Sequence, residues 1–367
     1  MIERLYVHNF RCLENFTLDL KGRGSVLIIG KNGSGKSTLR QAFGVFQSIC
    51  RGANRVKAWI DASDFTQHRK DIPMRFEIEL KLNEKHYKYA ISFEMPDNFR
   101  EARVAEESLV VAGEEIFSRQ RSQISLPGGS TFGLDWHVAA LPVFEERSGK
   151  STVQPLKDFL ASTILIAPVP REMSGFSDEE SVELQENAGN CSAWFNTLII
   201  HTPAAYPCIV TYLQSLIPDF ESFENRPRGE EGKQLSVVFE QKQTRKQLLL
   251  EFNKLSDGEK CFFLSALIVA SNKVSSNPVF CMWDEPDNHL SLPEIGHFVT
   301  QLRKLANRNG QFIATSHHPE TIRQFSDDST LVFSRKSHLE PTVVRPLADL
   351  EYSGDLIEAI IRGEVIE

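Results

Sequence analysis

The chain has 367 residues, 41% of them hydrophobic and 25% charged, which is typical of a folded globular protein and argues against intrinsic disorder. Its formal net charge of -8 argues against a protein that coats nucleic acid through a uniformly basic surface. The sequence has no signal-peptide pattern and no run of 18 apolar residues, and its six cysteines form no Cys-x-x-Cys pair. We therefore expect a cytoplasmic protein with reduced cysteines and no membrane partner.

The N-terminal part of the chain predicts strands of two kinds. Residues 2–20 and 73–95 alternate apolar and polar side chains, which indicates antiparallel strands with one covered face. We expect further antiparallel strands over 104–147. Residues 25–29 are short and almost wholly apolar, as in a buried central strand, and a helix is expected to begin at Thr38.

The pattern changes in the rest of the chain. Residues 163–167 predict another buried strand, and residues 173–190, which are acidic and unpatterned, predict a mobile loop. We expect helices over 191–217 and two strands over 234–252. Beyond residue 255 we expect alternating elements, with helices at 259–273, 292–308 and 319–324 and strands at 278–283, 311–315 and 329–333.

One segment predicts nucleotide binding by itself. Gly30–Ser37 matches G-x-x-x-x-G-K-[ST], the phosphate-binding loop (P-loop), between an apolar strand and a helix. Its glycines let backbone N–H groups approach phosphate, Lys36 can reach the β- and γ-phosphates, and the Ser37 hydroxyl can bind Mg²⁺. The expected nucleotide contacts of this segment are Gly30, Asn32, Gly33, Ser34, Gly35, Lys36, Ser37 and Thr38.

A second segment, Val279–Glu285 (the Walker B segment), is an apolar strand that ends in two carboxylates. Asp284 is placed to bind Mg²⁺, and Glu285 can polarise an attacking water. The alternative is a surface acidic pair at a strand end, which the apolar run before it and Pro286 after it disfavour.

A third segment, Leu255–Glu259 (the signature segment), opens a helix. Ser256 is a natural N-cap and Glu259 stands three residues later, as in a capping box. A well-capped helix explains this pattern without any ligand. The functional interpretation uses the same helix N-terminus, with Ser256 and the small Gly258, to bind the γ-phosphate of ATP held by a second copy.

Together these segments resemble the ABC-type ATPases, in the branch that includes RecF, the SMC proteins and OLD-like ATPases. The signature segment has that branch's LSxGE form, and Asn9-Phe10-Arg11 resembles its opening, which implies that Arg11 lies near the nucleotide. Ala314–His317 (the switch segment) resembles the segment whose histidine contacts the γ-phosphate, which implies that role for His317 rather than His318. A metal site at the two adjacent histidines is a disfavoured alternative.

The chain departs from this family pattern at two points. Pro286–Ser291 (the D-loop) resembles D-loops of ABC proteins, but Ser291 stands where their final Asp is usual. Residues 168–172 occupy the expected Q-loop position without a glutamine. Gln67 and Gln185 are alternative substitutes between which the sequence does not decide.

The resemblance implies an α/β P-loop NTPase fold with an ABC-type head, namely a mixed sheet with an antiparallel β subdomain and an inserted helical lobe. We expect an N-terminal ATPase lobe over 1–172, an acidic loop and helical lobe over 173–230, and a C-terminal ATPase lobe over 231–367.

The implied activity is hydrolysis of ATP with Mg²⁺, by a homodimer or higher even-numbered oligomer that assembles around ATP and switches a DNA-related process. We favour the ATPase component of a bacterial anti-phage defence system. Its effector or nuclease would be a separate protein, because too few residues follow His317 for a TOPRIM nuclease. The alternatives are a slowly hydrolysing ATP-bound scaffold that sequesters a toxic effector, and a RecF-like DNA repair ATPase. The LSxGE signature disfavours a transporter subunit.

Two weaker signals remain. Asp219 with Glu231 and Lys233 has the loose spacing of a PD-(D/E)xK nuclease, but without the strand context that the motif requires. Three basic clusters could contact DNA or form solvated faces, and they are residues 68–70, 242–246 and 303–308.

Overall fold

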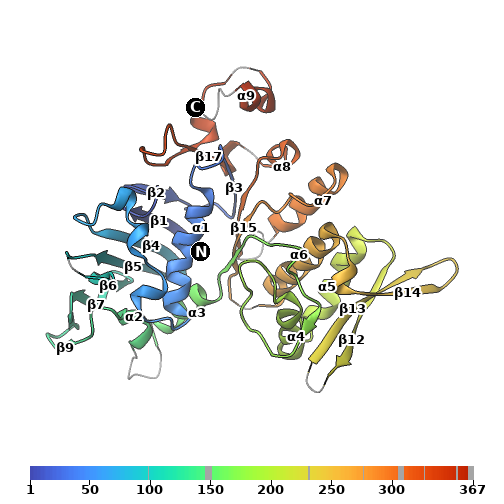
Figure 1. The fold of residues 1–367 in the computed structure, drawn as a ribbon, viewed down its shortest axis with the longest axis horizontal. Coiled ribbons are helices and arrows are strands. Elements are labelled where there is room, and N and C mark those ends of the chain that lie inside the picture. Colours follow the sequence, from blue (N-terminus) through green and yellow to red (C-terminus); the bar gives the residue numbers. More distant parts are fainter. Residues whose placement is uncertain are drawn as a thin grey trace. The chain divides into compact units, whose positions relative to one another are not determined.

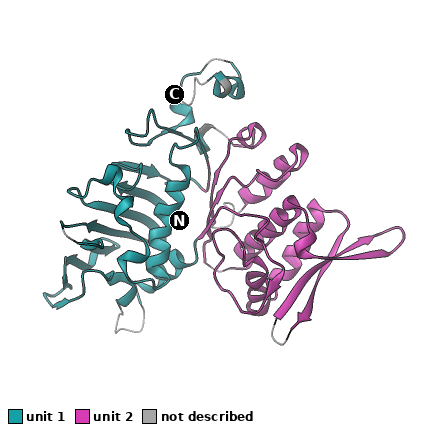
Figure 2. Ribbon diagram, viewed as in Figure 1, with its two compact units in different colours: residues 1–23, 28–163, 327–367 teal, residues 24–27, 164–326 magenta. Residues whose placement is uncertain are grey.

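The computed structural model describes residues 1–367 except 98, 145–150, 230–231, 276, 305–309, 326, 353 and 363–367. The chain forms two compact units, and both are discontinuous in sequence (Figure 2). Unit 1 contains residues 1–23, 28–163 and 327–367, whereas unit 2 contains residues 24–27 and 164–326. The three-part division expected from the order of motifs stays a prediction.

Unit 1 contains an eight-stranded antiparallel sheet in the order β2-β1-β4-β5-β6-β7-β8-β9 (Figure 1). In β4 every second side chain is buried, as the alternating sequence predicts, and Phe76 lies opposite Val7 and Ile91 in the two neighbouring strands. The strands are β1 (Ile2–His8), β2 (Phe16–Asp19), β4 (Met74–Leu82), β5 (Lys85–Glu94), β6 (Arg103–Val111), β7 (Glu114–Gln120), β8 (Gln123–Ser125) and β9 (Thr131–Gly133).

The predicted strands over 104–147 are confirmed only as far as β9. Ala140–Val143 forms the short helix α2 instead, because the Ala140 and Leu141 N–H groups donate to the buried Glu107 carboxylate rather than to a strand. Residues 145–147 of that prediction lie outside the described residues.

Helix α1 (Lys36–Cys50) begins two residues before the predicted Thr38. Its apolar side packs on the eight-stranded sheet, where the Phe46 ring lies 6.2 Å from that of Phe76 and 6.0 Å from that of Tyr89. Its far end is fixed to α3 (Gln154–Ala161), since Arg51 Nε donates to the Ala161 carbonyl at 3.0 Å. This packing gives the helix that follows the P-loop a rigid support.

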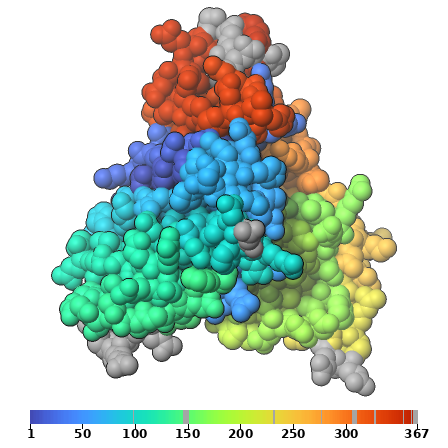
Figure 3. Space-filling view, turned by 60° about the vertical axis from the view of Figure 1, so that its left-hand side comes forward, coloured from blue at the N-terminus to red at the C-terminus, as the bar shows by residue number. Residues whose placement is uncertain are grey.

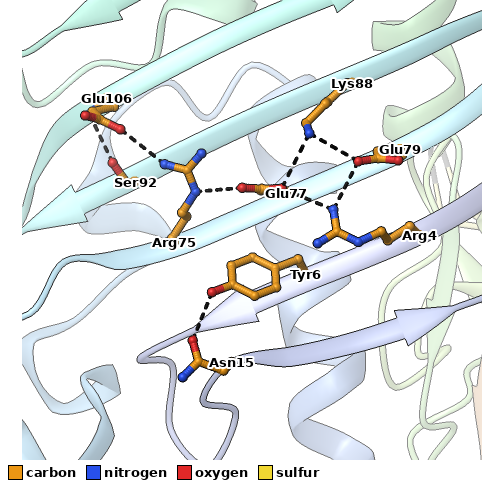
Figure 4. Close-up of polar contacts among 9 residues, drawn as sticks. All are labelled: Arg4, Tyr6, Asn15, Arg75, Glu77, Glu79, Lys88, Ser92 and Glu106. Atoms are coloured by element: carbon orange, nitrogen blue, oxygen red, sulfur yellow. Dashed lines mark hydrogen bonds and ion pairs between the residues drawn. The ribbon is translucent and has the colours of Figure 1, made fainter.

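The exposed face of the eight-stranded sheet carries a network of ion pairs (Figure 4). The Arg4 guanidinium lies 3.2 Å from the Glu77 carboxylate and 3.0 Å from that of Glu79. The Arg75 guanidinium lies 2.7 Å from the same Glu77 carboxylate and 3.1 Å from that of Glu106. Cations and carboxylates therefore neutralise one another across strands, so this face is not a basic surface.

A second sheet has the order β10-β15-β16-β3-β17-β18 and is mixed, as predicted. β10, β15 and β16 pair in parallel, whereas β17 and β18 pair antiparallel. All of these strands except β18 are predicted by the sequence. The strands are β3 (Ser25–Ile29), β10 (Ile164–Ile166), β15 (Phe280–Asp284), β16 (Gln311–Thr315), β17 (Thr330–Ser334) and β18 (Val343–Pro346).

Besides β10, β15 and β16, unit 2 contains a lobe of helices and a small antiparallel sheet. Its core is aromatic: the Phe263 ring lies 5.6 Å from Phe195, 5.4 Å from Phe223 and 4.8 Å from Phe252. The helices expected over 191–217 are present, but β12 was not predicted. The elements are α4 (Cys191–His201), α5 (Ala205–Leu216), α6 (Asp257–Val274), β11 (Phe176–Ser177), β12 (Phe220–Arg228), β13 (Gly232–Gln241) and β14 (Lys246–Glu251).

Residues 173–190, expected as an unpatterned mobile loop, contain β11 and are tied down by hydrogen bonds. The Glu186 and Asn187 carbonyls accept N–H groups from Ala167 and Val169 at 2.9 and 3.0 Å. Backbone pairing that the acidic sequence does not indicate thus fixes this segment beside the end of β10.

The remaining helices are α7 (Leu292–Arg303), α8 (Pro319–Arg323) and α9 (Leu356–Arg362). The predicted helix 292–308 is confirmed to Arg303, and its last residues lie outside the described part of the chain. Among the described residues no helix is both long and apolar enough to cross a membrane.

Candidate nucleotide site

The P-loop lies in unit 1 between β3 and α1. Gly33 and Gly35 have φ angles of +79° and +103°, a left-handed conformation that side chains disfavour. Gly35 is the N-cap of α1, so the N–H groups of the first helical turn follow the loop directly. The Lys36 ammonium donates to the carbonyls of Gly30 at 2.7 Å and Lys31 at 3.2 Å, which folds its side chain back over the loop.

Arg11 lies beside α1 in the same unit. Its backbone is left-handed, with φ of +52°, and its side chain is 43% exposed. The guanidinium pairs with Asp64 at 2.8 Å and also donates to Gln41 on α1. Unit 1 thus brings Arg11 to the helix that follows the P-loop, and its expected position near the nucleotide stays a prediction. Asp64 and Gln41 were not singled out from the sequence, although Asp61-x-x-Asp64 is a recognisable capping pattern.

In unit 2, the Walker B and switch segments meet at adjacent strand ends. β15 pairs with β16 so that Asp284 lies opposite Thr315. The Thr315 hydroxyl donates to Asp284 and accepts the Glu285 N–H at 3.0 Å. Thr315 therefore fixes both carboxylate residues, a role that sequence reasoning did not assign to it.

Glu285 and His317 face each other at this edge. Glu285 Oε1 lies 3.7 Å from His317 Nε2, and Asn288 donates to the other carboxylate oxygen. Their side chains are 36% and 42% exposed, so both are accessible to a ligand from solvent. Glu285 has a φ of +52°, a strained conformation for a residue with a side chain.

His318 has a different position. Its ring Nδ1 accepts the N–H of Glu320 at 3.2 Å, which caps α8. Asp287, which is buried in the D-loop, accepts the hydroxyls of Ser316 and Thr321 and so attaches the D-loop to the switch segment. The geometry favours His317 over His318 as the histidine available to a ligand.

The signature segment has the predicted capping box. Ser256 Oγ accepts the Glu259 N–H at 3.3 Å, and Glu259 accepts the Ser256 N–H at 2.7 Å. A Cβ on Gly258 would lie 3.0 Å from the His289 carbonyl oxygen, so the D-loop runs close beside this helix end. Gly258 is therefore explained by local packing in unit 2.

The two departures from the family pattern have structural counterparts. Ser291 and Glu294 form a capping box for α7, so the hydroxyl that replaces the usual Asp starts a helix. Buried Lys260 of α6 donates to the Pro170 carbonyl at 2.9 Å, which ties the signature helix to the loop expected as the Q-loop. Gln67 belongs to unit 1, where it donates to the Leu339 carbonyl at 2.6 Å, whereas Gln185 lies in unit 2.

Sequence comparison decides the family to which these features belong. Residues 1–340 match the family described as the RecF/RecN/SMC N terminal domain. The chain belongs to this family. A search of curated proteins found no significant match.

Solved structures of SMC heads share the fold of this family member. An SMC head bound to the C-terminal winged-helix domain of ScpA has 16% sequence identity and a TM-score of 0.58, covering 94% of this chain and 98% of that one. An SMC head with an extended coiled coil, bound to the C-terminal domain of ScpA derived from Pyrococcus furiosus, has 14% identity and a TM-score of 0.53. That match covers 95% of this chain and 96% of the other. The α/β P-loop fold with an antiparallel subdomain, expected from the resemblance, is confirmed.

RecF/RecN/SMC proteins are ABC-type ATPases, which implies ATP and Mg²⁺ as ligands. The residues of this member fit them. A Cβ on Gly33 would meet nothing within 4 Å, so the middle of the P-loop is open, and the buried Ser34 hydroxyl has no hydrogen-bond partner among the described residues. Hydroxyl and carboxylate oxygens, as on Ser37 and Asp284, are the ligands that Mg²⁺ prefers.

Proposed function

We propose that this RecF/RecN/SMC member binds and hydrolyses ATP. The P-loop residues Gly30 to Thr38, with Arg11 nearby, bind the nucleotide, and Ser37 and Asp284 supply oxygen ligands for Mg²⁺. Bound Mg²⁺ would neutralise charge on the phosphates. Lys36 stabilises charge that develops on the γ-phosphate.

The placement of Glu285 beside His317 is the observation that best supports ATP hydrolysis. The Glu285 carboxylate orients the attacking water and accepts its proton, while His317 contacts the γ-phosphate. The 3.7 Å between them leaves both groups at one exposed strand edge, beside the Asp284 carboxylate. A positioned general base contributes about 10²- to 10⁴-fold to such a rate.

We further propose that the site is completed by a second copy. Ser256, Gly258 and Glu259 of the partner would contact the γ-phosphate through the N-terminus of α6, which has 18 residues, an exposed N-cap at Ser256 and a half-buried first turn. Such a sandwich forms a homodimer, or a higher even-numbered oligomer, only while ATP is bound. Closure and opening then form a switch.

The biological process proposed for this switch is DNA-related. We favour the ATPase of a bacterial anti-phage defence system that controls a separate effector or nuclease protein. The two SMC heads above are each bound to a separate protein, ScpA, which supports a partner by analogy. An ATP-bound scaffold that sequesters a toxic effector and a RecF-like DNA repair ATPase are the alternative functions.

The deciding experiment is the solution mass of Glu285→Gln with and without Mg-ATP. This variant keeps the side-chain shape but removes the base, so ATP-dependent doubling of mass is expected. Lys36→Ala in the same background is the control and should stay monomeric. An E285Q protein that is monomeric in saturating Mg-ATP would overturn the sandwich proposal.

Co-purification from the native host with the same variant separates the three processes. A bound nuclease or other effector whose activity changes with ATP favours defence. A fixed assembly with a partner, indifferent to ATP and showing one turnover followed by negligible steady-state hydrolysis, favours the scaffold. ATP-dependent retention on gapped DNA without a protein partner favours repair.

A further inference from the structure

The C-terminal hairpin of unit 1 lies against the P-loop. Residues 335–342 join β17 to β18, and buried Thr342 donates from its backbone N–H to the Cys12 carbonyl at 2.9 Å. Its hydroxyl donates to the Ser34 carbonyl at 2.8 Å, across 308 positions of sequence. The space-filling view shows the red C-terminal residues directly against the blue N-terminal ones (Figure 3). Thr342 of the C-terminal hairpin therefore contacts the P-loop directly.

Two P-loop glycines are enclosed by this hairpin. A Cβ on Gly35 would lie 2.7 Å from Thr342 Oγ1 and 3.0 Å from Cys12 Sγ, and a Cβ on Gly30 would lie 2.3 Å from the Phe333 carbonyl oxygen of β17. A side chain at Gly30 would therefore collide with backbone, and one at Gly35 would displace the Thr342 or Cys12 side chain. Gly33, between them, faces open space.

We propose that Thr342 is a positioning residue for nucleotide binding, an inference that rests on the proposed binding of ATP. In a planar trans peptide the C=O and the following N–H point in opposite directions. A hydroxyl that holds the Ser34 carbonyl toward the hairpin therefore holds the Gly35 N–H away from it. That N–H, together with those of the first turn of α1, is then directed as a phosphate-binding loop requires.

The Thr342 hydroxyl suits this task because both partners are buried. The hydrogen bond is removed from solvent, and a hydrogen bond in a low-dielectric setting is less easily exchanged for water. The backbone bond from Thr342 to Cys12 fixes where the hydroxyl is presented, and Cys12 in turn contacts Thr38 at 3.6 Å. An orientation set before ATP arrives avoids part of the entropy loss on binding.

The test compares Thr342→Val and Thr342→Ser, with the exposed neighbour Val343→Thr as control. Valine has nearly the same volume but no hydroxyl, whereas serine keeps the hydroxyl. We expect the Kd for Mg-ATP, measured by calorimetry on nucleotide-free protein, to rise about tenfold in T342V. T342S should restore binding to within about twofold, and V343T should leave the Kd unchanged.

Two further readouts separate positioning from simple stabilisation. Mg-ATP is expected to protect the Gly35 amide against hydrogen exchange in wild type and T342S, and to protect it less in T342V when each protein is saturated with nucleotide. A purely structural residue would lower the melting temperature of the nucleotide-free protein while leaving the Kd of the folded fraction unchanged, and that result would overturn the inference. If T342V does not fold, Thr342→Ala takes its place, because it leaves no methyl group against Gly35.

The outcomes distinguish this inference from the proposed function. Wild-type protein that binds no Mg-ATP would overturn the proposed function and the inference together. Normal wild-type binding, with an unchanged Kd and unchanged protection of the Gly35 amide by Mg-ATP in T342V, would overturn the inference alone.

Discussion

At the residue scale, the buried hydroxyl of Thr315 holds the residues at the ends of β15 and β16 in place. Thr315 has no solvent exposure, and its single Oγ1 bonds both Asp284 and the Glu285 backbone. Its partners are the two carboxylate residues proposed for Mg²⁺ binding and for activation of water. A buried residue thus controls the geometry of two residues that are proposed to contact the ligand.

Replacing Thr315 by valine should therefore impair turnover more than binding. The change keeps the shape but leaves the Glu285 N–H without its acceptor, so we expect kcat for ATP hydrolysis to fall about tenfold or more, with the Kd for Mg-ATP within about threefold of wild type. Steady-state hydrolysis and equilibrium binding provide the two measurements. Thr300→Val, which removes an exposed hydroxyl from α7, is the matched control. Unchanged kcat in T315V would contradict the assigned role.

A second residue-scale prediction concerns Glu107, which is fully buried in unit 1. Its carboxylate accepts the Tyr89 hydroxyl at 2.8 Å and lies 3.4 Å from buried Arg119. Loss of hydration on burial raises the pKa of Glu107 above its ordinary value, despite these partners. Because its pKa is raised in the folded state, Glu107 binds its proton more tightly there than in the unfolded chain. The resulting stabilisation is fully present at pH values below the unfolded pKa and is lost as pH rises through the folded pKa.

Glu107→Gln should consequently be destabilised relative to wild type by less at high pH than at low pH. The variant lacks the titrating group, so the difference in unfolding free energy between wild type and variant, about 1–3 kcal/mol from the altered hydrogen bonds, should shrink as pH rises from 4 to 8. Urea unfolding at several pH values gives this difference. Glu106→Gln, on the solvent side of the same strand, controls for the change in charge. A difference in unfolding free energy that grows with pH would show that the pKa of Glu107 is lowered rather than raised.

At the element scale, the three basic clusters have different surroundings. Arg69 pairs with Glu14 at 2.8 Å, and Arg303 stacks on the Phe325 ring and donates to main-chain oxygen, while residue 308 lies outside the described part of the chain. Lys242, Arg245 and Lys246 instead lie exposed at the tip of the β13–β14 hairpin, which projects from its sheet (Figure 1). We therefore propose this tip as the DNA contact.

Removing these three cations should weaken DNA binding in a salt-dependent way. Each phosphate contact contributes a slope of about -0.9 to log K against log salt, so K242Q/R245Q/K246Q should flatten the slope by about one to three. The measurement is the affinity for a DNA duplex at several NaCl concentrations. The control is K57Q/K81Q/K88Q, which makes the same change in net charge at cations that already pair with carboxylates. Equal effects in both triple variants would mean that net charge, not the hairpin, governs binding.

At the scale of the whole molecule, the proposed ligand contacts come from segments of both compact units. The P-loop and Arg11 belong to unit 1, and the signature, Walker B and switch segments belong to unit 2. Binding to the folded chain alone stabilises it by mass action.

Mg-ATP at about 100 times its Kd should raise the free energy of unfolding by about 2.7 kcal/mol. For units of this size that corresponds to a rise in melting temperature of several degrees, at about 2–4 °C per kcal/mol. Scanning calorimetry with and without Mg-ATP measures the shift, and Lys36→Ala should melt at the same temperature with and without Mg-ATP. The same shift in K36A would indicate that ATP binds elsewhere.

The sequence by itself determined the family resemblance, the kinds of element and the capping boxes, because these depend on residues within a few positions of one another. Alternation in β4, the apolar run of β3 and the Ser256–Glu259 cap are all local patterns. β12 was not predicted because its second half is exposed and polar and so shows no alternating pattern. Its pairing with β13 makes it a strand.

Only the tertiary structure decided which side chains hold the candidate site in place. Thr342 reaches Ser34 across 308 positions, Arg11 meets Asp64 across 53, and Thr315 meets Asp284 across 31. No periodicity relates such residues, since packing of the sheets and helices brings them together. The groups proposed to touch the nucleotide could be found in short motifs, whereas the groups that orient them are ordinary hydroxyls and carboxylates whose importance lies in burial and partnership.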